Sequence, residues 1–164
     1  VSTVWNGPFD SDAFDLDIQY GTGNWPGFSS VRLTQETLTP LCAPDVALRT
    51  PDDLRGKRLL HVLGYQEGWG VWLKAAGVRG VDAGQGLQLD NSLTALALAR
   101  MGGGVALGRS SIAAQDLAEG RLIAPFDLAV PTSEGFHLLQ PALGKGHAKA
   151  PRFVDWLCAE AAGP

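Results

Sequence analysis

Apolar residues recur along this chain with two different spacings, one typical of strands and one typical of helices. Over residues 15–20 apolar and polar side chains alternate, and this period of two predicts a half-buried strand. Over residues 69–76 the apolar side chains recur at i, i+3, i+4 and i+7, which predicts a helix that Gly77 ends. The chain therefore combines strand and helix patterns rather than repeating one of them.

The same patterns predict the remaining elements. Further strands are expected over 1–5, 36–43, 58–63, 86–89, 105–108, 121–126 and 135–140, with a turn-rich loop over 6–12. Further helices are expected with N-caps at Thr50, at Asn91 or Ser92 and at Ser110 or Ser111, and Pro151 is expected to open the last helix. This order predicts an α/β fold with a largely parallel sheet. In such a sheet the helix N-termini gather at the carboxyl edge, where ligands bind.

Composition narrows the classes of function. The 164 residues fit one domain or two small lobes, and the 45 % hydrophobic content supports a packed core. A net charge of −4 without a basic stripe argues against a nucleic-acid-binding surface in this chain. The apolar runs are far shorter than the ~20 residues that span a bilayer, so we expect no membrane contact.

Motifs of catalysis and cofactor binding are not found. The glycines of 102–108 do not fit GxGxxG, and the sequence contains no GxxxxGK[ST], GxSxG, HExxH or CxxC. We therefore expect no cofactor, no metal site, no catalytic residue and no enzyme activity. Cys42 and Cys158 are expected to be two buried free thiols in a cytoplasmic protein, with a disulfide as the alternative.

What remains is a geometry suited to binding. Asn91 and Ser92 stand at the expected N-terminus of a helix, where N–H groups and the helix dipole attract polar or anionic groups. They are either ordinary N-caps or ligand contacts, and the pattern leaves both alternatives open. A glycine-rich turn over 21–27 follows the first strand and contains Trp25. We expect Trp25 to pack this turn rather than to contact a ligand.

Six short stretches, taken together, carry a family resemblance. They are DLDIQYGTGNWPG (15–27), TLTPLCAP (37–44), TPDDL (50–54), EGWGVWLKAAG (67–77), LDNSLTALALARMGGGVALG (89–108) and FVDWL (153–157). In this order they resemble the effector-binding domain of LysR-type transcriptional regulators. The most similar subgroup contains the glycine-cleavage and β-lactamase regulators, whose strand typically reads IRYGxGxWPG. The resemblance covers nearly the whole chain.

The resemblance implies a two-lobed α/β fold of the periplasmic-binding-protein-like type 2, with two hinge crossovers. The first lobe is expected to comprise 1–44 and 125–164, and the second lobe 45–124. The boundary between the lobes at Ala43–Pro44 is compatible with a hinge crossover, because proline keeps the residue before it extended. We expect the first lobe to be incomplete, without its first strand and helix, and the winged helix-turn-helix to be missing from this chain.

The resemblance also implies an effector site in the cleft between the lobes. The corresponding positions are Gln19, Tyr20, Gly21 and Phe136 in the first lobe and Asn91 and Ser92 in the second. Gln19 stands where the family usually has arginine, and Phe136 where it often has tyrosine. A fixed positive charge and a hydroxyl group are therefore lost, and we expect the ligand to differ from those of the relatives.

The function that the resemblance implies is ligand sensing in a cytoplasmic transcriptional regulator. The effector is expected to be a small molecule, such as an amino acid or a peptide-like compound. The intact protein is expected to form a homo-oligomer and to contact DNA only through the missing N-terminal domain. A solute-binding protein of a transport system shares the fold and is the alternative. A small enzyme is a third class, for which the sequence offers no catalytic set.

Overall fold

The computed structural model describes residues 15–142 and 150–162, which divide into two compact units. The larger unit comprises residues 36–132, and the smaller unit comprises 15–35, 133–142 and 150–162. The chain thus changes units at 35–36 and 132–133, whereas the lobes inferred from the resemblance change at 44–45 and 124–125. Those lobe boundaries stay a prediction. The strand expected over 1–5 and the loop over 6–12 lie outside the described residues.

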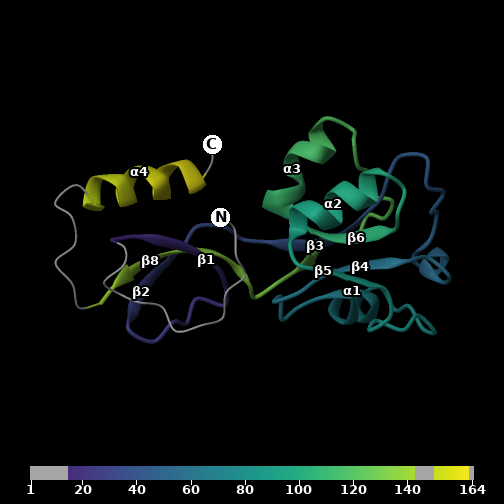
Figure 1. Ribbon diagram of the computed structural model, residues 1–164, viewed down its shortest axis with the longest axis horizontal. Coiled ribbons are helices and arrows are strands. Elements are labelled where there is room, and N and C mark those ends of the chain that lie inside the picture. The colour runs from purple at the N-terminus through teal and green to yellow at the C-terminus, as the bar shows by residue number, and fades with distance from the viewer. Residues whose placement is uncertain (1–14, 143–149, 163–164) are drawn as a thin grey trace. The chain divides into compact units, whose positions relative to one another are not determined.

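A mixed five-stranded sheet forms the centre of the larger unit, in the order β5-β4-β6-β3-β7 (Figure 1). Its strands are β3 (Thr37–Leu41), β4 (Leu59–Val62), β5 (Leu87–Leu89), β6 (Val105–Arg109) and β7 (Val130–Pro131). Strand β4 is parallel to β5 and β6, but β3 is antiparallel to β6 and β7. The prediction of a largely parallel sheet is therefore wrong.

Parallel pairing is confined to the strands that helices connect. Helix α1 (Trp69–Ala75) lies between β4 and β5 in the chain, and α2 (Ser92–Arg100) lies between β5 and β6. Such crossovers are what parallel neighbours require. The other helices of this unit are a 3₁₀ helix (Pro51–Leu54) and α3 (Ser110–Ala118).

The prediction of a strand over 121–126 is also wrong. Only Ile123 forms an isolated antiparallel bridge, and its partner is Cys42. Pro125 follows two residues later and has no N–H group with which to extend the pairing. The short strand β7 was not predicted from the sequence.

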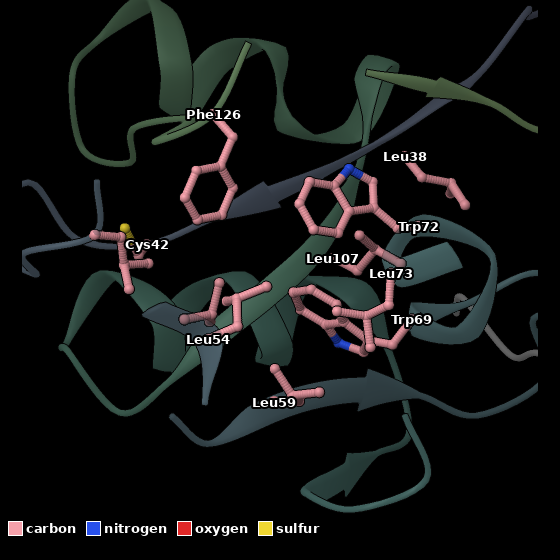
Figure 2. Packing of buried hydrophobic residues seen from close by; sticks show 11 residues of the cluster. Leu38, Cys42, Leu54, Leu59, Trp69, Trp72, Leu73, Leu107 and Phe126 are labelled. Atoms are coloured by element: carbon pink, nitrogen blue, oxygen red, sulfur yellow. The ribbon is translucent and has the colours of Figure 1, made fainter. Parts of the chain in front are cut away.

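Two hydrophobic clusters cover opposite faces of the larger sheet. Alternation along β6 places Val105 and Leu107 in one cluster and Ala106 in the other. The first cluster contains Trp69 and Trp72 of α1, and the Trp72 ring lies 5.6 Å from that of Phe126 (Figure 2). Both indole N–H groups donate to backbone carbonyl groups at 3.1 Å, so neither is left unpaired.

The second cluster packs α2 and α3 closely on the same sheet. Its buried members are all alanine or leucine: Leu41, Leu60, Ala95, Leu96, Ala99, Ala106, Ala113 and Leu122. Gly108 in β6 makes this approach possible. A Cβ atom on Gly108 would lie 2.3 Å from Cδ1 of Leu41 and 3.4 Å from Cβ of Ala113. The glycine therefore serves packing rather than an unusual backbone angle.

The smaller unit contains a three-stranded antiparallel sheet in the order β1-β8-β2 (Figure 1). Its elements are β1 (Asp17–Gly21), β2 (Phe28–Arg32), β8 (Gly135–Pro141) and α4 (Ala150–Ala162). Strand β2 was not predicted, because its sequence FSSVR has adjacent serines and no regular alternation. In the register Tyr20 faces Phe136 across the strands, and His137 lies between Gln19 and Arg32.

Both cysteines are free thiols, as the composition predicted. Cys42 is buried in the core of the larger unit, but Cys158 is only half-buried in α4, so the expectation that both thiols are buried is wrong for Cys158. Burial and the nearby Asp45 carboxylate raise the pKa of the Cys42 thiol. Cys42 therefore acts as a small core residue rather than a reactive nucleophile.

Candidate functional site

The two polar residues expected at the start of α2 have different roles. The Asn91 side-chain oxygen accepts a hydrogen bond from the Thr94 backbone N–H at 2.9 Å, which is an ordinary N-cap. Its amide group donates to Asp90 at 2.9 Å. The Ser92 hydroxyl instead leaves the helix and lies 2.5 Å from the hydroxyl of Tyr65. Of the two predicted residues, only Ser92 reaches beyond its own helix terminus.

Tyr65 connects Ser92 to a buried cation. The guanidinium carbon of Arg109 lies 3.8 Å from the centroid of the Tyr65 ring, a cation–π arrangement. Arg109 is only 3 % exposed, and one of its nitrogens donates to the backbone carbonyl of Glu67 at 2.5 Å. We call Ser92, Tyr65 and Arg109 the hydroxyl–guanidinium cluster.

The sheet topology explains why this cluster forms. Tyr65 follows β4, Ser92 follows β5 and Arg109 ends β6, and these three strands are parallel neighbours. Their carboxyl ends therefore share one edge, which is where ligands bind in open α/β sheets. Neither Tyr65 nor Arg109 was predicted from the sequence as a site residue. Their position directly after buried strand patterns was the signal that could have identified them.

Acidic groups complete this edge of the larger unit. Glu36 is 2 % exposed, and its carboxylate accepts hydrogen bonds from the hydroxyl and backbone N–H of Ser111 and from the hydroxyl of Ser110. The expectation that Ser110 or Ser111 caps α3 is therefore wrong. A carboxylate from the start of β3 occupies that helix terminus, where the dipole favours negative charge. Thr132 donates its hydroxyl to the Glu67 carboxylate.

In the smaller unit, the predicted residues lie on two different faces of the sheet. The rings of Tyr20 and Phe136 form an edge-to-face pair with centroids 5.1 Å apart. The backbone N–H of Phe136 donates to the Thr34 hydroxyl at 3.0 Å. Gln19 points to the opposite face, because neighbouring residues of a strand alternate, and its amide donates to Asp17 at 2.5 Å.

Gly21 and Trp25 are in direct contact at the end of β1. A Cβ atom on Gly21 would lie 3.0 Å from Cζ2 of the Trp25 ring. Trp25 also stacks edge-to-face on His137, with ring centroids 5.3 Å apart. Trp25 thus packs the turn onto its own sheet, as the sequence analysis expected.

In residues 15–142 and 150–162, no group of three or more His, Cys, Asp or Glu side chains is arranged to hold a metal ion. Among the same residues, no helix is long and apolar enough to cross a bilayer.

Comparisons with known proteins agree on one family. Residues 8–162 match the family model described as the LysR substrate binding domain. The chain is 34 % identical over 161 residues to the glycine cleavage system transcriptional activator of Escherichia coli, covering 93 % of this chain and 51 % of that protein. It is 36 % identical over 160 residues to the HTH-type transcriptional regulator PerR of Escherichia coli, covering 93 % and 52 %. The chain thus spans about half the length of these curated relatives.

A solved structure extends the comparison to the fold. The effector domain of the transcriptional regulator AmpR of Pseudomonas aeruginosa has a TM-score of 0.82 with this chain at 33 % identity. The match covers 92 % of this chain and 74 % of that one. The predicted α/β fold of the effector-domain type is therefore confirmed.

Proposed function

Because the chain belongs to the LysR substrate-binding domain family, we propose that it senses a small effector for a transcriptional regulator. The observation that supports this most directly is the hydroxyl–guanidinium cluster in the larger unit. It brings two hydroxyl groups and a buried guanidinium to the carboxyl edge of three parallel strands. These groups donate and accept hydrogen bonds, so they suit a polar effector such as an amino acid or a peptide-like molecule.

In the smaller unit, we propose that Tyr20, Gly21 and Phe136 supply effector contacts. The aromatic pair offers two ring surfaces, and the Tyr20 hydroxyl adds a donor and acceptor. Gln19 belongs to the same proposal, although its amide is held by Asp17 on the opposite face. Asn91 would contribute by holding the N-terminus of α2 in place for Ser92.

The proposed role in the whole regulator follows from the relatives. They are transcriptional regulators, one of them of the HTH type, and this chain spans about half of their length. We propose that the intact protein is a cytoplasmic homo-oligomer that contacts DNA through residues outside this chain. Effector binding would favour one of two conformations, since only a difference in affinity between them can transmit a signal. No catalytic step is part of this role.

A direct test is binding of small probes to the 164-residue chain. Glycine, alanine, the dipeptide Ala-Ala and benzoate would be titrated while amide chemical shifts are recorded by NMR. We expect one of these classes to shift amides around Ser92, Tyr65 and Arg109. Loss of one effector hydrogen bond in Ser92→Ala or Tyr65→Phe should then weaken binding by about tenfold.

Matched variants separate the site from general stability. Ser29→Ala removes an exposed hydroxyl on β2 that makes only a long contact of 3.4 Å, and should leave the dissociation constant unchanged. Tyr20→Ala tests the smaller unit. Equal binding by the parent chain, Ser92→Ala, Tyr65→Phe and Tyr20→Ala would show that these residues are not the effector site.

A further inference from the structure

His137 is a buried ionisable group that the proposed effector site does not use. It lies at the centre of β8 and is 4 % exposed. Neither of its ring nitrogens makes a hydrogen bond of good geometry, although the Gly21 backbone is an acceptor close to the ring. Buried polar groups are nearly always well paired, so a poorly paired imidazole in the core of a sheet requires an explanation.

A glycine-rich turn covers this imidazole. Residues 21–27, which we call the glycine turn, connect β1 to β2. Gly23 has a φ of +96°, and a Cβ atom there would lie 2.7 Å from Cε1 of His137. The turn can therefore rest on the ring only because residue 23 is glycine.

Three further contacts hold the glycine turn closed. The Trp25 ring packs edge-to-face on the imidazole at 5.3 Å. The Ser30 hydroxyl donates to the Gly23 carbonyl at 2.7 Å, and the Phe28 N–H donates to the Trp25 carbonyl at 3.2 Å. All of these contacts are compatible with a neutral, largely apolar ring under the turn.

Arg32 already places one positive charge beside His137, and the other charged groups nearby do not favour a protonated imidazole. Arg32 is its register partner on β2 and carries a guanidinium that donates to the carbonyls of Thr34 and Glu134 at 2.8 and 2.9 Å. On β1, the Asp17 carboxylate already accepts from the Ile18 N–H and the Gln19 amide. The glycine turn contains no charged side chain.

Within β8, the neighbours of His137 on the same face are Gly135 and Leu139, and neither carries a charge. Burial and the Arg32 guanidinium lower the pKa of His137, and the opposing influence of the Gly21 backbone is smaller. The closed turn therefore holds the imidazole in its neutral form.

We propose that the glycine turn is an acid-sensitive latch, which closes on the neutral imidazole of His137 and opens when that ring takes up a proton. Burying an imidazolium is costly unless it is well hydrogen-bonded, and the Gly21 backbone, which is the acceptor that the closed turn supplies, does not offset the burial. Opening would release Trp25 and the end of β1. Closing the latch requires no effector, but its opening would move Gly21 and the end of β1, which the proposed effector site also uses.

The direction of the pH effect follows from linkage. The closed state has the lower pKa, so at moderately acidic pH the open state binds more protons. The closed form is therefore most favoured above about pH 6.5, the ordinary value for histidine. It loses stability as the pH falls below that value, until the pKa of the closed form is passed.

The test is amide exchange in the 164-residue chain, followed by NMR between pH 7.5 and pH 5. The Phe28 amide reports the latch, because it donates to Trp25 across the turn. After correction for the intrinsic exchange rate, its protection should fall by up to about tenfold per pH unit. The ring signals of His137 should titrate below pH 6.5 in the same range.

Variants without a titratable group at position 137 show whether His137 causes the pH response. In His137→Phe and His137→Gln, Phe28 protection should no longer depend on pH. Gly23→Ala should lower this protection at every pH, because the added methyl group meets the ring. His61→Gln is the matched control: that half-buried histidine lies in the larger unit and bonds the Gln85 carbonyl, so the pH response should remain.

Two results would overturn the latch. One is a pH response of Phe28 that persists in both His137 variants. The other is a His137 ring in the parent chain that titrates at or above pH 6.5 while Phe28 stays protected. The second measurement needs no variant, so the proposal remains testable if the substitutions prevent folding.

Discussion

The carboxylate of Asp116 accepts two hydrogen bonds from one nitrogen of Arg100, at 2.8 and 2.9 Å. Arg121 donates to the same carboxylate at 2.6 Å, and the Asp116 side chain is only 7 % exposed. This carboxylate therefore joins the end of α2 to α3 and the segment that follows it. It is the place where one substitution should disturb the packing of both helices.

Asp116→Asn should lower the free energy of unfolding by about 2–3 kcal/mol, because Arg100 loses this carboxylate and Arg121 keeps Glu119 but loses its second anion. Urea titration followed by circular dichroism measures this change. Asp52→Asn is the matched control, since Asp52 pairs with Arg55 in solvent and both side chains are more than half exposed. A loss in the control as large as that in Asp116→Asn would contradict the assignment.

The same carboxylate predicts an acid-sensitive contribution to stability. Burial raises the pKa of Asp116, but the hydrogen bonds from Arg121 and Arg100 outweigh it and leave the pKa below its ordinary value. A lowered pKa stabilises the fold above about pH 4, the ordinary value, and the contribution is lost as the pH falls through the folded-state pKa. Comparing urea midpoints of the parent chain and Asp116→Asn at pH 7 and pH 3 should show the gap narrowing at pH 3.

Gly108→Ala should destabilise the larger unit by about 1–3 kcal/mol through overpacking, since its methyl group would meet Leu41 at 2.3 Å. Gly70→Ala is the control, and it should change the free energy of unfolding in the opposite direction. Gly70 is exposed within α1, and the nearest atom to its added Cβ would be 3.8 Å away. That variant should gain about 0.5–1 kcal/mol from helix propensity. Thermal unfolding of both variants checks the pair, and equal shifts would refute the packing argument.

Glu36→Gln tests the carboxylate at the N-terminus of α3. The amide oxygen of glutamine can still accept from Ser110 and Ser111, but the negative charge opposite the helix dipole is lost. We expect a loss of about 1 kcal/mol in the free energy of unfolding. Glu160→Gln in α4 is an exposed control and should have no measurable effect. An unchanged unfolding midpoint in Glu36→Gln would show that the charge itself contributes nothing.

Tyr65→Phe separates the hydroxyl from the ring in the hydroxyl–guanidinium cluster. The phenyl ring should stay over Arg109, so the variant should remain within about 1 kcal/mol of the parent in stability. Tyr65→Ala removes the cover of a buried guanidinium and should cost more than Tyr65→Phe. The two urea midpoints check this order, and a reversed order would mean that Ser92, not Arg109, is the important partner of Tyr65.

The positions of most helices and strands could be predicted because their signals are local. The spacing of Trp69 and Trp72 predicted α1, and the polar residues before Leu93 predicted the start of α2. Glycine, proline and capping residues act on their immediate neighbours, so the sequence contains that information directly. The ordered set of motifs also predicted the family, which the comparisons confirm.

The candidate site could be predicted only in part. Ser92 was expected at a helix N-terminus, but its partner Tyr65 follows β4, and Arg109, which packs on the Tyr65 ring, ends β6. A strand pattern shows which residues are buried and does not show which strand is the neighbour. For the same reason the antiparallel pairing of β3 with β6 was missed.

The sequence by itself determined most of the helices and strands and the family. It also determined the alternation along the first strand that places Gln19 and Tyr20 on opposite faces. Only the tertiary structure decided that Ser92 meets Tyr65, that Glu36 rather than a serine caps α3, and that Gly23 rests on His137. Each of these contacts joins residues that are far apart in the sequence, and no local sequence pattern indicates that they meet. They exist because sheet order and close packing bring the residues together, and those are properties of the whole fold.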